Sequence, residues 1–184
     1  MKLFKNPFFA VALTVFVVLS SILINTNVGF GRKCRAVTDT FYGSTVSRSA
    51  PEVSIADALE SICTEAESLA VVADSCGVDA EDVRNDVFNL RRSIQTEFFY
   101  GIRSSYAALR SGLTTLLGQL AQADLDAQNA ETVSQCTAAI SDAQSAIAAS
   151  GYNDTVRAFL RRYDHFPTNV LADLAGVDYP ETFA

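Results

Sequence analysis

The chain has 184 residues and a formal net charge of −7, with 14 Lys and Arg residues against 21 Asp and Glu residues. All the acids and 12 of the cations follow residue 31, so this larger part carries a net charge of −9. Such a domain should be repelled by nucleic acid and by anionic lipid, and we expect neither as a partner. About 150 residues provide room for one domain of ordinary size.

An uncharged apolar run, Pro7 to Ile24, dominates the start of the chain. As a helix it would be about 27 Å long, close to the ~30 Å hydrocarbon core of a bilayer. The uncharged stretch continues to Gly31. We therefore predict a short tail at 1–6 and a single transmembrane anchor at 7–31, in the cell membrane.

A cleaved signal peptide is the alternative interpretation of this segment. Its apolar run is longer than the usual ~7–15 residues, and no cleavage site of the A-x-A kind follows it. Two lysines precede the run and three cations follow it, so the positive-inside rule does not set its orientation.

The four cysteines bear on the cellular compartment. They are Cys34, Cys63, Cys76 and Cys136, an even number whose spacing fits no zinc motif. An oxidising compartment would allow them to pair, and we predict a disulfide that involves Cys34 and Cys63. Buried free thiols are the alternative. With the short N-terminal segment, this interpretation places the domain outside the cytoplasm.

The remaining chain reads as helices. Residues 32–50 are predicted to extend the membrane helix and then to form a linker with breaker residues from Gly43 onward. The next helix should start near Ser49–Glu52 and end at Gly77, which is suited to the C′ position.

A second and longer helix is predicted from Asp79–Asp82 to Leu120. Its apolar residues keep steps of three and four over some 37 positions, about 55 Å of helix. Gly101 and Gly112 would mark a bend or a close approach of helices. Its arginines should pair with acids of the preceding helix; they are Arg91, Arg92, Arg103 and Arg110.

The last long helix should run from about Asn129 to Tyr163, after a polar turn at 124–129. Its apolar stripe shifts at Ser150–Gly151, which predicts a kink there. We predict an all-α fold: a single N-terminal transmembrane helix followed by an elongated antiparallel four-helix bundle at 51–166. The extended membrane helix would supply the fourth element, and 167–184 would form a C-terminal turn and tail.

The C-terminal part carries a recognisable pattern. It reads Tyr-Asn-Asp-x-Val from residue 152, Phe-Pro-x-Asn-x-x-Ala from residue 166, and a glycine at 176. This pattern resembles the C-terminal signature of the LemA family, and the order of elements is similar too. The matching residues are Tyr152, Asn153, Asp154, Val156, Phe166, Pro167, Asn169, Ala172 and Gly176. The basic-Tyr-Asp-x-Ile-Pro-Asn-Leu segment typical of the family after its anchor is not found here.

The resemblance implies a bacterial single-pass membrane protein without an assigned enzymatic activity. Read physically, Tyr152 and Val156 share one helix face, and Asn153 and Asp154 should lie near the bundle interface. Phe166–Pro167 should end the helix, and Asn169 should cap or turn the chain.

No catalytic motif accompanies this pattern. His165 is the only histidine, and no glycine-rich phosphate loop, Gly-x-Ser-x-Gly or HExxH sequence is present. We therefore predict no enzyme activity, no cofactor and no metal site. The expected function is a non-catalytic scaffold or interaction module of the cell envelope, bound to another envelope protein. The alternative is a ligand-sensing extracytoplasmic domain that acts through a partner; the oligomeric state is left open.

Overall fold

The computed structural model describes residues 7–43 and 53–183, which form seven helices and no strand. This confirms the predicted all-α fold. The chain divides into two compact units. The α1 unit contains Met1–Asp39 and Tyr152–Thr182, and the bundle unit contains Thr40–Gly151 and Phe183–Ala184.

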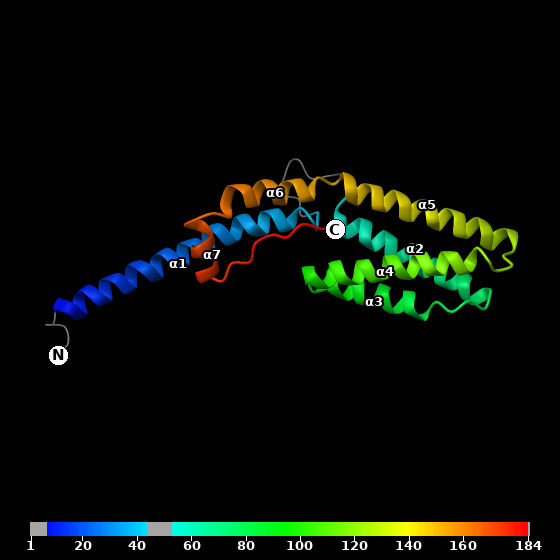
Figure 1. The fold of residues 1–184 in the computed structure, drawn as a ribbon, viewed down its shortest axis with the longest axis horizontal. Coiled ribbons are helices and arrows are strands. Elements are labelled where there is room, and N and C mark those ends of the chain that lie inside the picture. The colour runs from blue at the N-terminus through cyan, green and yellow to red at the C-terminus, as the bar shows by residue number, and fades with distance from the viewer. Residues whose placement is uncertain (1–6, 44–52, 184) are drawn as a thin grey trace. The chain divides into compact units, whose positions relative to one another are not determined.

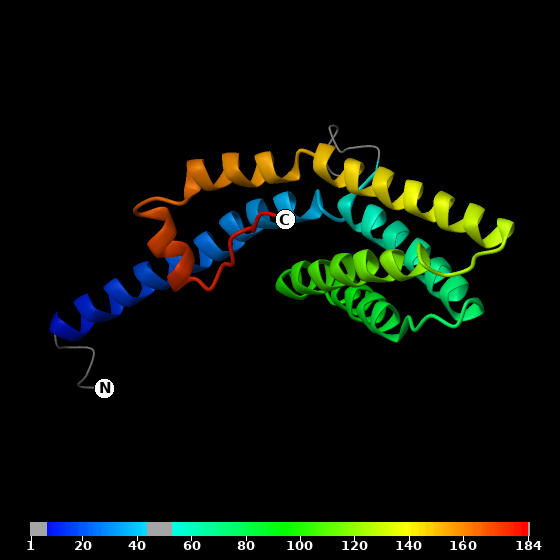
Figure 2. The ribbon, with the colours of Figure 1, turned by 45° about the vertical axis from the view of Figure 1, so that its right-hand side comes forward.

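Four helices make up the bundle unit: α2 (Ile55–Ser75), α3 (Glu81–Gln95), α4 (Phe99–Leu120) and α5 (Ala127–Ala149). Helix α2 lies beside α5, and α3 lies beside α4 (Figures 1 and 2). The largest fully buried aliphatic side chains of the core are Ile55, Leu59, Ile62, Leu69, Val87, Leu90, Ile102, Leu109, Leu116 and Leu120. Within each helix these positions are three, four or seven residues apart, so they lie on one face and the helix buries a single stripe.

The ends of α2 are set by local hydrogen bonds. At the start, the buried Ser54 Oγ accepts a hydrogen bond from Asp57 N at 3.0 Å, as an N-cap does. At the end, Gly77 has a φ angle of 70°, and Val78 N donates to Ala73 O at 2.9 Å. This is a Schellman ending, and it confirms Gly77 as the C′ residue. The predicted start at 49–52 lies outside the described residues.

The single helix predicted from Asp79–Asp82 to Leu120 is wrong, because the chain reverses at Thr96–Phe98. Glu97 takes a φ angle of 53°, Glu97 N donates to Ile94 O and Phe98 N donates to Ser93 O. These two bonds close a second Schellman turn, this time without glycine. The resulting α3–α4 hairpin completes four helices in the bundle, so the fourth helix is not the extended membrane helix that the sequence suggested.

Two of the three glycines of α4, Gly101 and Gly112, lie where α3 and α4 approach closely. A Cβ atom on Gly101 would lie 2.3 Å from Phe98 Cδ1 and 2.8 Å from Ser93 Oγ. A Cβ atom on Gly112 would lie 3.3 Å from Asp86 Oδ2. The close approach predicted from these glycines is confirmed.

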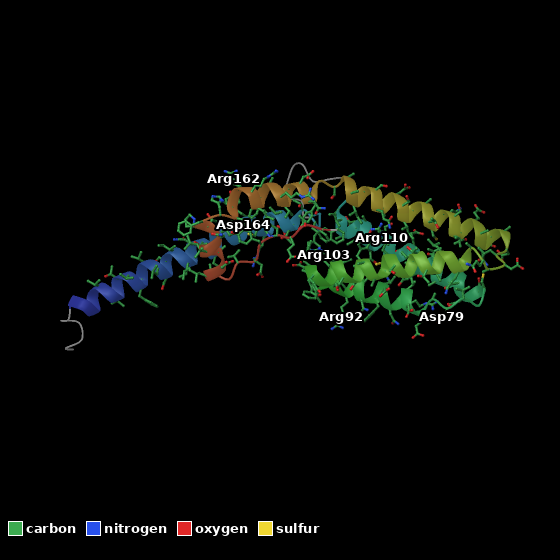
Figure 3. The ribbon with its side chains drawn as sticks, in the orientation of Figure 1. Asp79, Arg92, Arg103, Arg110, Arg162 and Asp164 are labelled. Atoms are coloured by element: carbon green, nitrogen blue, oxygen red, sulfur yellow. The ribbon has the colours of Figure 1, made fainter. Side chains whose placement is uncertain are left out.

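Ion pairs connect α3 to the acidic α2. Arg91 pairs with Glu60 at 2.7 Å and also with Glu67. Arg84 pairs with Asp74 in the last turn of α2. The groups are partly exposed, so each pair stabilises the bundle by only about 0–1 kcal/mol and mainly sets the register of the two helices. The expected pairing is confirmed for Arg91, whereas Arg92 points away from α3 (Figure 3).

The α1 unit is built on one 33-residue helix, α1 (Pro7–Asp39). Its apolar first half is exposed, with Leu13, Val15 and Phe16 at 44%, 52% and 68%. Within the described residues, the portion Leu13–Asp39 is the one segment long and apolar enough to cross a membrane. Helices α6 (Tyr152–Tyr163) and α7 (Thr168–Leu174) lie along the second half of α1 (Figures 1 and 2).

The irregularity predicted at Ser150–Gly151 is a complete break. Helix α5 ends at Ala149, Gly151 has a φ angle of 67°, and α6 begins at Tyr152. A φ angle in this region is easily adopted only by glycine. The two units divide at this break, so residues 152–166, which the sequence grouped with the bundle, belong to the α1 unit.

Candidate functional site

All nine residues of the C-terminal signature lie in the α1 unit, on α6, on α7 or beside them. Tyr152 and Val156 are buried at 3% and 0% exposure, which confirms that they share an inward face of α6. Asp154 is exposed and forms a 3.4 Å ion pair with Arg157 on the same helix. The expectation that Asp154 lies at a helix interface is wrong.

An aromatic cluster joins α1 to the C-terminal segment. The Phe30 ring lies 5.6 Å from Phe159, 5.5 Å from Tyr163 and 5.3 Å from Tyr179 between centroids. Lys33 lies over the Tyr163 ring, 4.9 Å from its centroid. Ring pairs at these separations stabilise beyond the area that they bury. Phe30 therefore fixes α6 and the tail to α1.

Hydrogen bonds hold the rest of the segment in place. Asn27 Nδ2 on α1 donates to Ala175 O at 2.7 Å, at the end of α7. Tyr179 donates its hydroxyl hydrogen to Tyr163 O, and Tyr152 donates to Glu181 O. The signature tyrosine thus holds the tail beside the start of α6.

The second half of the signature shapes α7. Helix α6 ends at Tyr163 before Phe166–Pro167, as predicted. Asn169 Oδ1 accepts a hydrogen bond from Val170 N in the first turn of α7, and Ala172 is fully buried. Gly176, with a φ angle of 64°, ends α7 in a Schellman turn in which Val177 N donates to Ala172 O. These residues build helix ends.

All four cysteines are free thiols in the structure. A disulfide between Cys34 and Cys63 would join the two units, and it stays a prediction. Cys34 lies in the α1 unit and Cys63 in the bundle unit, each buried on its own helix. Burial raises the pKa of the Cys63 thiol to about 12, and Glu60 contributes to this shift. Burial also raises the pKa of Cys136 to about 11. Only Cys76 is partly exposed, so the others are ordinary core residues.

A groove of about 650 Å³ runs along α4 in the bundle unit. Phe183 and Tyr106 line its base, with ring centroids 5.6 Å apart, and both are buried. Burial also raises the pKa of Tyr106. The exposed side chains along the groove are Tyr100, Arg103, Ser104, Ala107, Arg110, Ser111 and Thr114. Figure 3 shows Arg103 and Arg110 on this helix.

Sequence analysis did not identify this groove. Its signal was the second stripe of α4, residues 100, 103, 107, 110 and 114, spaced by three and four. Because a single long helix was predicted, these residues were interpreted as its ordinary solvent-facing side. The packing of Phe183 against Phe41, Phe99 and Tyr106 joins distant segments and has no local sequence signal.

No group of three or more His, Cys, Asp and Glu side chains within residues 7–43 and 53–183 is arranged to hold a metal ion. His165 lies exposed in the turn after α6, where its carbonyl accepts a hydrogen bond from Asn169 N. The arrangement offers surfaces and a groove for binding.

Comparisons with protein-family models, with curated proteins and with solved structures found no significant match.

Proposed function

We propose that this protein is a membrane-anchored, non-catalytic helical-bundle protein of LemA type, a scaffold or interaction module of the bacterial cell envelope. The observation that carries the proposal is the division of α1 into two halves. The first half is apolar and exposed, and the second half holds a folded aromatic cluster. An exposed apolar helix of this length is what a bilayer would cover.

The same observation favours a retained anchor over a cleaved signal peptide. Cleavage near residues 27–31 would remove Asn27 and Phe30, which hold α7 and the tail. Phe30 is only 7% exposed. A segment with these tertiary contacts behaves as part of the folded protein.

The α4 groove is the surface that we propose for the partner. Two arginines, Arg103 and Arg110, line it in a chain that is otherwise acidic, and Tyr100 is 69% exposed at its edge. Tyrosine and arginine are the residues most often found at the centre of protein interfaces. The complementary partner is a segment of another envelope protein that carries carboxylates beside apolar side chains.

A photo-crosslinking residue in place of Tyr100 tests this assignment in living cells. The matched control replaces Phe88, which is 64% exposed on α3 and does not line the groove. We expect one adduct of defined mass from position 100 and none from position 88. Arg110→Glu should abolish the adduct, whereas Arg92→Glu should leave it unchanged. Equal adducts at both positions, or an adduct indifferent to Arg110→Glu, would refute the groove as the interface.

We further propose that the bundle lies outside the cytoplasm, because Lys2 and Lys5 followed by an apolar run resemble the start of a secretory signal. Cys76 is the natural reporter of sidedness since it is the only partly exposed thiol. A membrane-impermeant maleimide should label it in intact cells, and Cys76→Ser should remove that label. Labelling that appears only after lysis would place the bundle in the cytoplasm.

A further inference from the structure

The α1 unit has a second exposed apolar surface outside the apolar half of α1. Phe166, which precedes α7, and Val170 and Leu174 on α7 are 79%, 45% and 67% exposed, and these three residues are called the α7 stripe. We propose that this α7 stripe lies in the headgroup–acyl boundary of the bilayer beside α1, so that the unit contacts the membrane through two elements. The inference rests on the proposed membrane anchor.

The position of α7 along α1 supports this assignment. The bond from Asn27 Nδ2 to Ala175 O, at 2.7 Å, fixes the end of α7 at the level of Asn27. Asn27 follows Ile24, the last residue of the apolar run, by about 4.5 Å of helix rise. The polar layer of a bilayer is roughly 5–8 Å thick on each side. The C-terminal end of α7 therefore lies at the depth of the headgroups.

The figures place α7 on the expected side. In both views α7 lies beside α1, nearer than α6 to the exposed N-terminal half of α1 (Figures 1 and 2). Helix α7 therefore lies beside the part of α1 that follows the proposed anchor (Figures 1 and 2). Lipid surrounds the anchor at that end, which makes lipid the occupant of the stripe.

Helix α7 has one side that faces the protein and an opposite side that is apolar and exposed, as an interfacial helix requires. Ala172, fully buried, is two positions from both Val170 and Leu174, about 200° around the helix. The protein-facing side is thus opposite the apolar exposed side. Short helices of this kind lie in the interface plane with the apolar side among the acyl chains.

The charged side chains near the α7 stripe do not determine how it binds the membrane. Arg161 and Arg162 end α6, while Asp164 and Asp173 flank the stripe, and all four are exposed. These opposite charges offset one another locally (Figure 3 labels Arg162 and Asp164). The stripe is therefore expected to insert through apolar burial, and zwitterionic lipid suffices.

The protein contains no tryptophan, so single tryptophans report depth without background. We would reconstitute the full chain with Phe166→Trp into phosphatidylcholine vesicles, brominated either near the glycerol or near the chain end. The inference predicts a blue-shifted emission and a loss of intensity that is greater with the shallow bromines. Phe88→Trp, at a position 64% exposed on α3, should remain unquenched.

A second control separates this inference from the proposed anchor. Val15→Trp, in the apolar half of α1, should be quenched by the deep bromines. Quenching of Val15→Trp without quenching of Phe166→Trp would overturn the α7 inference alone. If neither is quenched, the anchor itself fails and the inference with it. Equal quenching at positions 166 and 88 would also overturn the inference, because it would show non-specific adsorption.

Discussion

Glu97 holds the turn between α3 and α4 in a conformation that glycine adopts more easily. Within the part of the chain that the structure describes, it is the only residue other than glycine with a positive φ angle, 53°. Holding a residue with a side chain at such a φ angle costs the folded state roughly 1–2 kcal/mol. Replacement by glycine removes this cost, but it also makes the unfolded chain more flexible, which offsets part of the gain. We expect Glu97→Gly to raise the free energy of unfolding by about 0.5–1 kcal/mol.

Urea denaturation of the full chain in detergent micelles measures this change. Glu97→Ala serves as the control, since it removes the carboxylate and keeps Cβ. An equal gain from Glu97→Ala would assign the effect to charge and contradict the argument from backbone strain.

Gly101 should not tolerate a side chain, whereas Gly118 on the same helix should. A Cβ atom at 101 would meet Phe98 Cδ1 at 2.3 Å, while nothing lies within 4 Å of a Cβ atom at 118. Gly118→Ala should stabilise by up to about 1 kcal/mol through helix propensity. Gly101→Ala should instead destabilise the protein by about 1–3 kcal/mol through overpacking. Thermal unfolding of both variants tests the close approach; matching shifts would rule it out.

Cys63 makes the bundle sensitive to alkaline pH. Its thiol has a pKa of about 12 in the folded protein, against an ordinary value of 9.0. Because the folded pKa is raised, the stabilisation is fully present below pH 9 and is lost as the pH rises toward the folded pKa. The free energy of unfolding should fall by about 1 kcal/mol from this group between pH 9 and pH 10.

The comparison of pH slopes isolates this contribution. Cys63→Ala should lower stability at every pH and remove part of the slope above pH 9. If Cys63→Ala retains the full slope, other groups cause the alkaline loss.

At the scale of elements, the sequence was most informative where a glycine adopts a positive φ angle. Gly77 and Gly151 both have positive φ angles; the helix end at Gly77 was predicted, whereas at Gly151 only a kink was predicted and the helix ends there. The α3–α4 reversal was missed because Thr96, Glu97 and Phe98 include neither glycine nor proline, and the apolar stripe continues across them. Tertiary packing of the hairpin overrides local propensity there. Gly101 was the nearest indication of this reversal, because a glycine that permits a close approach implies a second helix packed beside the first.

The joining of α6 to α1 depends on Phe30. Replacing this ring, 7% exposed, by alanine should cost about 3–5 kcal/mol and loosen the C-terminal segment. Trypsin should then cleave faster at Arg157, Arg161 and Arg162 in the vesicle-bound chain. Phe16→Ala, at a 68% exposed site in the apolar half of α1, should leave the cleavage rate unchanged. Equal acceleration by both variants would mean that the ring cluster does not hold α6.

At the scale of the whole molecule, the class of fold and the apolar helix could be read from residue patterns, whereas the candidate sites could not. Helical periodicity and charge are local properties of the chain. The groove on α4 depends on Phe183 meeting Tyr106, and the α7 stripe depends on Asn27 meeting Ala175. These contacts join residues far apart in sequence, so spacing alone carried no sign of them. Of the nine signature residues, Phe166, Pro167, Asn169 and Gly176 lie at helix ends, whereas Tyr152, Val156 and Ala172 are buried in the α1 unit.

The central claim is that α1 is both a retained membrane anchor and the support of the C-terminal segment. The most direct test is the mass of the protein that resists alkaline extraction from cell membranes. We predict a membrane-bound chain whose mass still includes residues 7–31. A chain recovered in the soluble fraction, or one that begins after residue 24, would contradict the account.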